Sequence, residues 1–505
     1  MITRRCAFKY TVIGAAALTL PVSSLKSVQS AEVQRFFLSL EGDAARQLPE
    51  NKRIPFGWKA FALSPEGKSL LLRPNAAVDN QYAEYRLRLA TAVDMREEKL
   101  VQVRIANSQR IVGELDIRYS PVLHLYELAI PSEYIELITK YGIELKVVKG
   151  KQPAWFFSST SYDSDSKNTF LPQIVAIPSQ PPEPTEAFLS QLMSLNTLQP
   201  FGWMEGCVLD GLWQLYQRKD LEKAKTTIEN HLAKFFDAQG NFVHEDPRST
   251  PHDNRISGIE STLPFAVLSS LYPDHPLLEK VLDFWQSHRK ESGIVVDNSM
   301  VSAEGNYTIA YPMAVLADQR GDTALMELAT LQFQLRRKLL TDQQGNYYLR
   351  YHPDTQAHSF RFWARGLAWY MLGLARALPL AENYVSTEDL KEEFNRIAET
   401  VVSYQRPDGL WHCFIDHSSV AVDTSGSAGI AAALASGATD NLLDRSFLDA
   451  ATKTWQGLQS YITPDGFLTG GAQSNRGGLA LQESNYRVIT QMGMGLMGQL
   501  YACIE

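Results

Sequence analysis

One turn recurs five times along the chain, as Ala238-Gln-Gly240-Asn-Phe242, Glu291-Ser-Gly293-Ile-Val295, Gln343-Gln-Gly345-Asn-Tyr347, Pro407-Asp-Gly409-Leu-Trp411 and Pro464-Asp-Gly466-Phe-Leu468. Each copy follows an amphipathic, charge-bearing helical stretch and precedes a more apolar one. The five glycines lie 53, 52, 64 and 57 residues apart, which is the length of one helical hairpin plus a loop. A repeat of this length indicates stacked units that bury their apolar faces only against their neighbours.

Two kinds of helix alternate between these turns. Charged, amphipathic helices are expected to begin near Glu186, Asp220, Pro276, Asp322, Thr387 and Leu443. Helices rich in Gly and Ala with few charges are expected to begin near Phe201, Ser257, Tyr307, Phe360, Asp423 and Asn485. Because helices that are apolar on most sides must be enclosed, the alternation predicts an (α/α)6 six-hairpin barrel over residues 186–505. The inner helices should begin at one end of the barrel, around a pocket.

The segment before the barrel has a period of two. Residues 87–91, 115–119 and 143–147 alternate apolar and polar side chains, as strands with one buried face require. This pattern predicts an antiparallel β-sandwich over residues 32–177. Four prolines then mark a stiff linker over residues 178–185, since proline sustains neither a helix nor an inner strand.

The first 31 residues predict an export signal. A charged start with the pair Arg4-Arg5 precedes an apolar run over residues 10–22 and small residues near Ser30 and Ala31. The arginine pair is typical of a bacterial twin-arginine signal, with an ordinary secretory signal or an uncleaved anchor as the alternatives. We therefore expect a periplasmic or extracellular protein. No later segment approaches the roughly 18 apolar residues that a membrane-spanning helix needs.

Composition narrows the class of protein further. The 505 residues are 45% hydrophobic and 21% charged, with a formal net charge of −8, so the chain lacks the basic footprint of a nucleic-acid binder. Beyond the signal, Cys207, Cys413 and Cys503 are too widely spaced for a disulfide framework or a zinc site, and we interpret them as buried apolar residues. The sequence contains no His-Glu-x-x-His, EF-hand or phosphate-binding motif. We expect no metal and no cofactor, and the sequence does not indicate an oligomeric state.

Candidate site residues cluster in the loops before the inner helices. Between His244 and Glu260 the chain carries two histidines, two arginines and four carboxylates. Within this loop we select His252 and Arg255 as ligand-binding candidates, against the alternative of a solvated loop. Glu260 lies inside an apolar run, where a carboxylate is either paired or functional. Glu304 opens the next apolar helix, as a cap of the helix dipole or as a proton donor.

The strongest local pattern is Phe362-Trp363-Ala-Arg365-Gly-Leu-Ala-Trp369. A planar guanidinium between indoles suits a sugar ring that bears a carboxylate, because the ring stacks and the guanidinium binds the acid in two places. The last loop, residues 470–478, leads into the final helix through Tyr486 and Arg487, which we select as further ligand-binding candidates. This loop is polar and is predicted to close over a ligand.

These motifs resemble glycoside hydrolase families 88 and 105, the unsaturated glucuronyl and rhamnogalacturonyl hydrolases. The resemblance rests on residues 363–369, the turn Asp408-Gly-Leu-Trp-His412 and the segment Asp423-Thr-Ser-Gly-Ser-Ala428. It covers roughly residues 201–505 and leaves the sandwich outside. It implies an acid that protonates the ring double bond left by a polysaccharide lyase. Water then adds, and the resulting hemiketal opens to release the sugar, unlike the two-carboxylate displacement of most glycosidases.

The resemblance also implies where the catalytic groups lie. In these families the acid stands six or seven residues before a proline of an inner helix, and counting back from Pro312 reaches Asn306 and Gly305. Glu304 is the nearest carboxylate, and the second family aspartate maps close to Glu260. A family histidine maps near Tyr348, which makes His358 a ligand-binding candidate.

Three hypotheses follow from the sequence. In the first, the chain hydrolyses unsaturated uronyl oligosaccharides with Glu304 as acid, Glu260 as base and Arg365 on the carboxylate. In the second, it is another glycoside hydrolase on the same barrel, using His252, Asp253 or Glu260. In the third, it binds carbohydrate without catalysis and has lost the acid.

Overall fold

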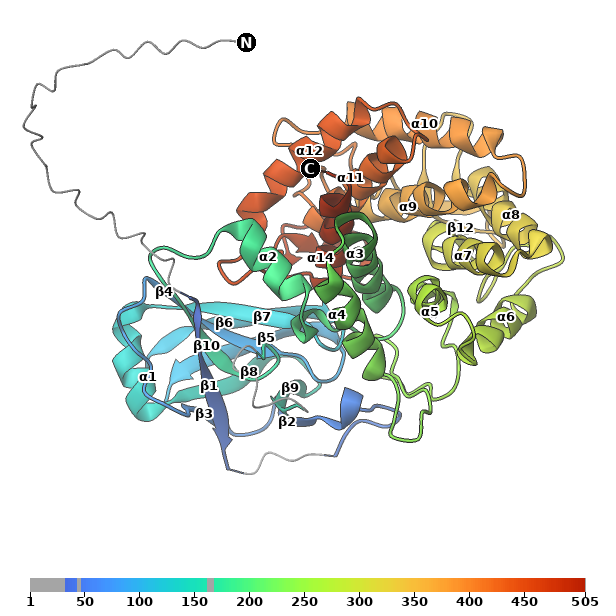
Figure 1. Ribbon diagram of the computed structural model, residues 1–505. Coiled ribbons are helices and arrows are strands. Elements are labelled where there is room, and N and C mark those ends of the chain that lie inside the picture. Colours follow the sequence, from blue (N-terminus) through green and yellow to red (C-terminus); the bar gives the residue numbers. More distant parts are fainter. Residues whose placement is uncertain (1–31, 43–46, 161–167, 505) are drawn as a thin grey trace, which may run out of the picture.

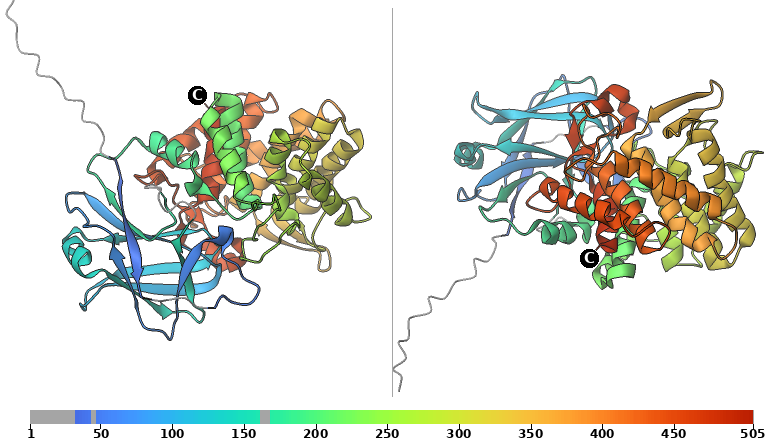
Figure 2. Two further views of the ribbon diagram at one scale, coloured as in Figure 1. Left: turned by 60° about the horizontal axis from the view of Figure 1, so that its bottom comes forward. Right: turned by 90° about the horizontal axis from the view of Figure 1, so that it is seen from above.

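The computed structural model describes residues 32–42, 47–160 and 168–504, which form a β domain and a helical domain side by side (Figure 1). The export signal predicted over residues 1–31 lies outside the described residues. Figure 2 shows that the C-terminal part of the helical domain lies against the β domain. None of the helices in the described part is long and apolar enough to cross a bilayer.

The β domain is built from antiparallel strands. They are β1 (Gln34–Glu41), β2 (Lys59–Leu63), β3 (Leu70–Pro74), β4 (Glu84–Ala90), β5 (Met95–Ile105), β6 (Ile111–Ser120), β7 (Leu125–Ile130), β8 (Ile143–Lys149), β9 (Ala154–Ser159) and β10 (Gln173–Ile177). Eight of the described strands form one sheet in the order β6-β5-β8-β3-β1-β10-β4-β7, and β2 pairs with β9. Helix α1 (Ile135–Tyr141) precedes β8.

The sandwich prediction needs a correction, although the antiparallel pairing holds. The two layers are one continuous sheet, because β1 belongs to both: Gln34–Phe37 pair with β10 and Leu38–Glu41 pair with β3. Alternate residues of both halves, such as Leu87 of β4 and Val103 of β5, are fully buried in one core. The alternation in the sequence identifies the buried face, but it carries no information about which strands are shared.

The helical domain begins after β10. Its longer helices are α2 (Pro184–Leu192), α3 (Trp203–Lys219), α4 (Glu222–Ala233), α5 (Phe265–Leu271), α6 (Leu277–Ser287), α7 (Tyr311–Arg320), α8 (Thr323–Leu340), α9 (Ala364–Ala381), α10 (Glu388–Ser403), α11 (Thr424–Thr439), α12 (Phe447–Leu458) and α14 (Gln491–Cys503). The short α13 (Leu479–Glu483) lies in the last loop.

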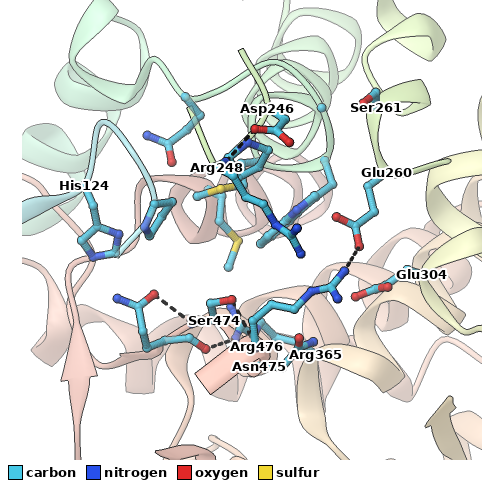
Figure 3. Close-up of a pocket in the computed structure, with 18 of the residues that line it drawn as sticks. His124, Asp246, Arg248, Glu260, Ser261, Glu304, Arg365, Ser474, Asn475 and Arg476 are labelled. Carbon is cyan, nitrogen blue, oxygen red and sulfur yellow. Dashed lines mark hydrogen bonds and ion pairs between the residues drawn. The ribbon is translucent and has the colours of Figure 1, made fainter. Parts of the chain in front are cut away.

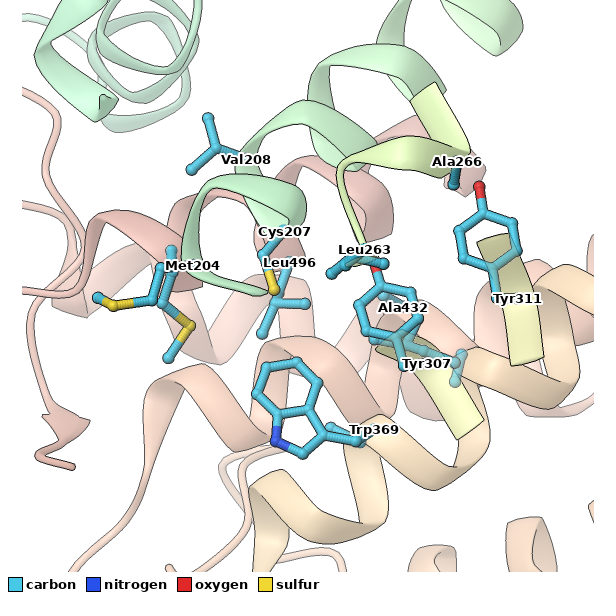
Figure 4. Close-up of a cluster of buried hydrophobic side chains, with 14 of the residues drawn as sticks. Met204, Cys207, Val208, Leu263, Ala266, Tyr307, Tyr311, Trp369, Ala432 and Leu496 are labelled. Atoms are coloured by element: carbon cyan, nitrogen blue, oxygen red, sulfur yellow. The ribbon is translucent and has the colours of Figure 1, made fainter. Parts of the chain in front are cut away.

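Six of these helices pack in a cycle. Within the described residues, α3 contacts α5, and the contacts continue through α7, α9, α11 and α14 back to α3. Each packs on one charged helix, in the pairs α3–α4, α5–α6, α7–α8, α9–α10, α11–α12 and α14–α2. Figure 4 shows side chains of the inner helices and the turns before them meeting in one cluster, including Cys207, Leu263, Tyr307, Trp369, Ala432 and Leu496. The helices approach closely where glycines face each other, since a Cβ on Gly211 would lie 2.3 Å from the Gly495 carbonyl oxygen.

The five turns quoted above share one conformation. Their glycines all have positive φ, at 79°, 93°, 80°, 84° and 96°, a region that side chains disfavour. In each turn the glycine N–H donates to the carbonyl three residues earlier, for example from Gly240 to Asp237 and from Gly466 to Thr463. The turn ends each charged helix and leads the chain toward the pocket end of the next inner helix.

Three inner helices, α5, α9 and α14, begin later than the sequence predicts. Helix α5 was expected near Ser257 and starts at Phe265, after a 3₁₀ turn over Ile259–Thr262. Residues near Phe360 form a hairpin of β12 (Tyr348–His352) and β13 (Ala357–Arg361) next to β11 (Val301–Ser302), so α9 starts only at Ala364. The helix predicted near Tyr307 does begin there, as a π-helical turn over residues 306–310, η5, that continues into α7. Before α14, β14 (Gly471–Ala472) pairs with β15 (Arg487–Val488). Each loop is therefore folded rather than open.

Ion pairs hold the two domains together. Asp465, in the fifth glycine turn, accepts hydrogen bonds from the fully buried Arg88 at 2.7 and 3.0 Å and from Arg35 at 3.1 Å. These arginines keep the pKa of Asp465 far below its usual range, against the effect of burial. Since a buried charge must be paired, this contact fixes the β domain relative to the helices.

Candidate active site

A cavity of about 320 Å³ opens where the inner helices begin, as the loop pattern predicts (Figure 3). Its walls come from the starts of α3, α5, α7, α9 and α14, from the last loop and from the β domain. The lining includes Arg96, His124, Gln199, Trp203, Asp246, Arg248, Glu260, Asp297, Glu304, Trp363, Arg365, Trp369, Gln473, Asn475 and Arg476.

Glu260 lies on a short 3₁₀ turn, Ile259–Thr262, just before α5. The turn is held from both ends: the Ile259 N–H donates to Asp297 at 2.8 Å, and the Thr262 hydroxyl donates to the Ile259 carbonyl at 3.1 Å. Pro264 then begins the helix, where its missing N–H needs no partner. The local sequence therefore places the Glu260 carboxyl at the cavity rather than in the apolar core around it.

Glu304 lies at the start of the next inner helix and faces the same end of the cavity (Figure 3). The Ser302 hydroxyl donates to Glu304 Oε2 at 2.8 Å. Of the three positions considered for the acid, only Glu304 lines the cavity. Asn306 is fully buried, and a Cβ on Gly305 would lie 2.2 Å from the buried guanidinium of Arg336.

The electrostatics of this end single out Glu260. Burial, followed by the charge of Glu304, raises the pKa of Glu260 to about 7, while Arg476 opposes the rise. A guanidinium nitrogen of Arg476 lies 4.0 Å from Glu260 Oε1. Burial also raises the pKa of Asp297 above its usual value. A carboxyl that is partly protonated near neutral pH in a cavity is a candidate proton donor.

The predicted aromatic platform lies in the cavity wall. Trp363 and Trp369 are almost fully buried, and both line the cavity. The Arg365 guanidinium lies 4.8 Å from the Trp363 ring, donates to the Gln473 carbonyl and approaches Asp423 at 3.6 Å. Arg365 is thus partly committed to holding the last loop in place.

Two predicted binding residues of the long loop do not line the cavity. The Arg255 side chain is exposed, and His252 lies 3.6 Å from Asp246. The neighbouring carboxylates are also engaged, because Asp253 and Glu245 both accept hydrogen bonds from Arg53 of the N-terminal domain. Much of the charge in this loop therefore joins the two domains.

His358, Tyr486 and Arg487 also lie outside the cavity lining. His358 is exposed on the β12–β13 hairpin and contacts the Leu339 carbonyl at 2.9 Å. The Tyr486 hydroxyl donates to the Asp116 carbonyl of the β domain at 2.9 Å. The Arg487 guanidinium donates to four backbone carbonyls, including that of Ala421 at 2.8 Å. These three side chains make contacts within the chain and do not line this cavity.

Several lining residues were not selected from the sequence. Asp297, Arg248 and Arg476 belong to loops that the repeat places at the pocket, so their position in the hairpin was an available signal. Arg96 and His124 come from the β domain, and no sequence pattern connects them to the barrel. Among the described residues, no group of three His, Cys, Asp or Glu side chains is arranged to hold a metal ion.

The family model for Glycosyl Hydrolase Family 88 matches residues 183–503. The chain belongs to this family. The unsaturated rhamnogalacturonyl hydrolase YesR of Bacillus subtilis is 34% identical over 108 residues, which are 21% of this chain and 31% of that protein. The unsaturated 3S-rhamnoglycuronyl hydrolase of Formosa agariphila is 33% identical over 113 residues, 21% of this chain and 29% of that protein. The match thus spans about a third of the length of these curated relatives.

Solved structures share the fold of this family 88 chain. A family 105 glycoside hydrolase of C. acetobutylicum superposes with a TM-score of 0.54 at 20% identity, covering 64% of this chain and 99% of that one. A possible family 105 member from Salmonella enterica superposes with a TM-score of 0.53 at 19% identity, covering 60% and 82%. The superposed part, 60–64% of this chain, corresponds in length to the helical domain.

Proposed function

We propose that this protein hydrolyses oligosaccharides that carry an unsaturated uronyl unit at one end, the product of a polysaccharide lyase. We interpret the cycle of inner helices and their outer partners as the (α/α)6 barrel of such enzymes. One observation carries the proposal: Glu260 and Glu304 face one end of the cavity, and burial together with the charge of Glu304 raises the pKa of Glu260 to about 7.

The raised pKa of Glu260 reverses the roles expected from the sequence. We assign the acid to Glu260, which retains a proton near neutral pH, and the base to Glu304. Glu260 donates its proton to one carbon of the ring double bond, and water adds to the other carbon while its proton passes to Glu304. The product is a hemiketal that opens and releases the next sugar, so each turnover consumes one water molecule.

Two guanidinium groups are available for the uronyl carboxylate. Arg476 is half exposed and reaches across the cavity toward Glu260. Arg365 lies deeper, at the start of α9, and is oriented by Asp423 and Gln473. A carboxylate held by guanidinium groups is bound by charge-assisted hydrogen bonds, which would orient the double bond toward Glu260. Trp363 and Trp369 supply an apolar wall for the sugar ring.

The test is direct, because hydration of the double bond removes the ultraviolet absorbance of the conjugated enoate. Purified protein is mixed with lyase-generated disaccharides from several uronate polymers, and absorbance and released sugar are followed together. We expect absorbance to fall for at least one substrate. We expect Glu260→Gln and Glu304→Gln each to lower kcat by about 100-fold or more. Both variants should still bind the substrate, as seen by thermal stabilisation.

The outcomes separate the alternatives. If no unsaturated uronide loses its absorbance, the proposal is wrong. Release of reducing sugar from saturated oligomers would indicate another glycosidase activity in the same cavity. Stabilisation by oligosaccharides without any turnover would indicate a carbohydrate-binding protein. Export through the predicted signal over residues 1–31 remains a prediction, which fractionation of cells that express the full chain would test.

A further inference from the structure

The β domain forms one wall of the cavity. Arg96, Pro121 and His124 line it, and all three precede the segment that the family model matches, residues 183–503. This wall is fastened to the helical domain by Lys52, which pairs with Asp94 inside the β domain and donates to the Arg248 carbonyl of the helical domain. The family match therefore covers the residues of the helical domain that line the cavity. It does not cover the β-domain residues on the opposite wall.

His124 is the first unexplained group on this wall. Its side chain is buried, and burial lowers its pKa to about 4, so the imidazole is neutral at pH 7. The backbone is fixed by Thr91, whose hydroxyl accepts from the His124 N–H at 3.0 Å, and the ring packs 5.2 Å from Tyr126. Within the described residues, Nε2 of His124 has no hydrogen-bond partner. Buried polar atoms normally have one, which makes the ring a place for a ligand hydroxyl.

Arg96 and Arg248 are the second unexplained feature. Arg96 donates through Nε to Asp94 at 2.9 Å and through Nη2 to the Pro247 carbonyl at 2.7 Å, which places it beside Arg248 in the chain. Its remaining nitrogen, Nη1, has no partner among the described residues, and 29% of the side chain is exposed. The Arg248 side chain is exposed and forms no ion pair within the described part. Both guanidinium groups line the same cavity, and guanidinium groups of this kind suit a carboxylate or sulfate.

His124 lies away from Glu260 and Glu304. In Figure 3, His124 stands on one side of the cavity and Glu260 and Glu304 on the other, with Arg248 and Arg476 between them. A ligand whose double bond reaches Glu260 therefore extends toward the β domain through its next unit.

We propose that the β domain supplies the subsite for the second sugar of the substrate. In this subsite His124 hydrogen-bonds a hydroxyl, and Arg96 with Arg248 binds an acidic group on that sugar. The inference rests on the proposed function for the first sugar. It identifies the substrate class as an unsaturated uronyl unit linked to an acidic sugar, and it makes the β domain part of the active site.

The experiment compares three substrates that share the unsaturated uronyl unit: its methyl glycoside, a disaccharide with a neutral second sugar and a disaccharide with a uronate second sugar. The measured quantity is kcat/KM for each disaccharide divided by kcat/KM for the methyl glycoside. For the wild type we expect this ratio to be highest with the uronate. If the wild type acts on none of the three, the proposed function fails. If it acts on them with equal ratios, only the β-domain subsite fails.

Variants assign the ratio to particular side chains. Arg248→Gln should lower the ratio for the uronate disaccharide by about 10-fold or more, the worth of a charged hydrogen bond, and spare the neutral one. His124→Phe should lower the ratio for both disaccharides by about 2-fold to 10-fold. His124→Gln keeps a hydrogen-bonding side chain, so its ratio should lie between those of His124→Phe and the wild type. Arg110→Gln, exposed on the β domain away from the cavity lining, is the matched control.

The proposal is overturned if these variants slow the methyl glycoside as much as the disaccharides, or if the ratio does not move in any of them. Thermal unfolding of each variant checks the fold. Should His124→Phe not fold, the exposed Arg248 carries the test alone, because its loss removes charge without opening the core.

Discussion

Replacing Glu260 by Gln should stabilise the protein at alkaline pH while abolishing turnover. The folded-state pKa of Glu260 is raised from 4.5 to about 7, so between these values the folded state binds more protons than the unfolded state. Stability therefore falls as pH rises through this window, and above pH 7 the folded protein carries the full cost of the buried charge. Below about pH 4.5 Glu260 is neutral in both states and has no such effect.

The size of the effect follows from the shift and the exposure. Without screening, the rise in pKa corresponds to roughly 3.4 kcal/mol. Because 36% of the Glu260 side chain is exposed, solvent screens part of it, and we expect Glu260→Gln to gain about 1–2 kcal/mol at pH 8. At pH 4.5 the same variant should match the wild type to within about 0.5 kcal/mol.

Urea unfolding followed by tryptophan fluorescence at pH 4.5, 6 and 8 measures this difference. Glu66→Gln, at an exposed position of the β domain, is the control and should show no change with pH relative to the wild type. Equal stability of Glu260→Gln and wild type at pH 8 would refute the reasoning, and so would a gain that is the same at all three pH values. Either result would mean that Glu260 is solvated like a surface carboxyl and is not a proton donor near neutrality.

Three further predictions concern other parts of the molecule. Asp465→Asn should destabilise the protein by about 3–5 kcal/mol, because it leaves buried arginines at the domain interface with less compensating charge. Thermal unfolding and limited proteolysis between the domains would measure the loss of stability. An unchanged melting midpoint would contradict the prediction. Gly305→Ala should fold poorly, since its Cβ would lie 2.2 Å from the Arg336 guanidinium; normal expression and melting of this variant would show that the helix start can shift. Arg476→Gln should raise the pKa of Glu260 and so move the alkaline limb of the kcat/KM profile to higher pH. The expected shift is up to about 0.7 unit, because the positive charge removed lies 4.0 Å from the carboxyl in a high dielectric. A limb that moves to lower pH would exclude Glu260 as the acid.

Much of the helical domain is predictable because its signals are local. The glycine of each turn has a positive φ. Each turn follows a charged helix and precedes an apolar one. The five copies therefore specify the order of the hairpins along the chain. The same logic places the loops before the inner helices at one end. Glu260, Glu304 and Trp363 were found in this way, since each lies at the start of an inner helix.

The sequence could not separate lining residues from structural ones in those loops. Tyr486 and Arg487 have the chemistry of sugar ligands, yet they bind backbone carbonyls. His358 lies on a hairpin whose strands pair with β11, a contact between distant segments that no local period reports. Side-chain type constrains what a residue can bind, but its partner depends on where the chain folds back.

By itself, the sequence determined the alternation of charged and apolar helices, the antiparallel domain before them and the end of the helical domain where a site can lie. These follow from side-chain periodicity and from the backbone freedom of glycine, which act over a few residues. The packing of distant segments, in contrast, raises the pKa of Glu260 to about 7 and brings Arg96 and His124 of the β domain to the cavity. Both depend on charges and surfaces brought together across the whole chain, and the energies of burial and Coulomb interaction depend on distance in space rather than in sequence.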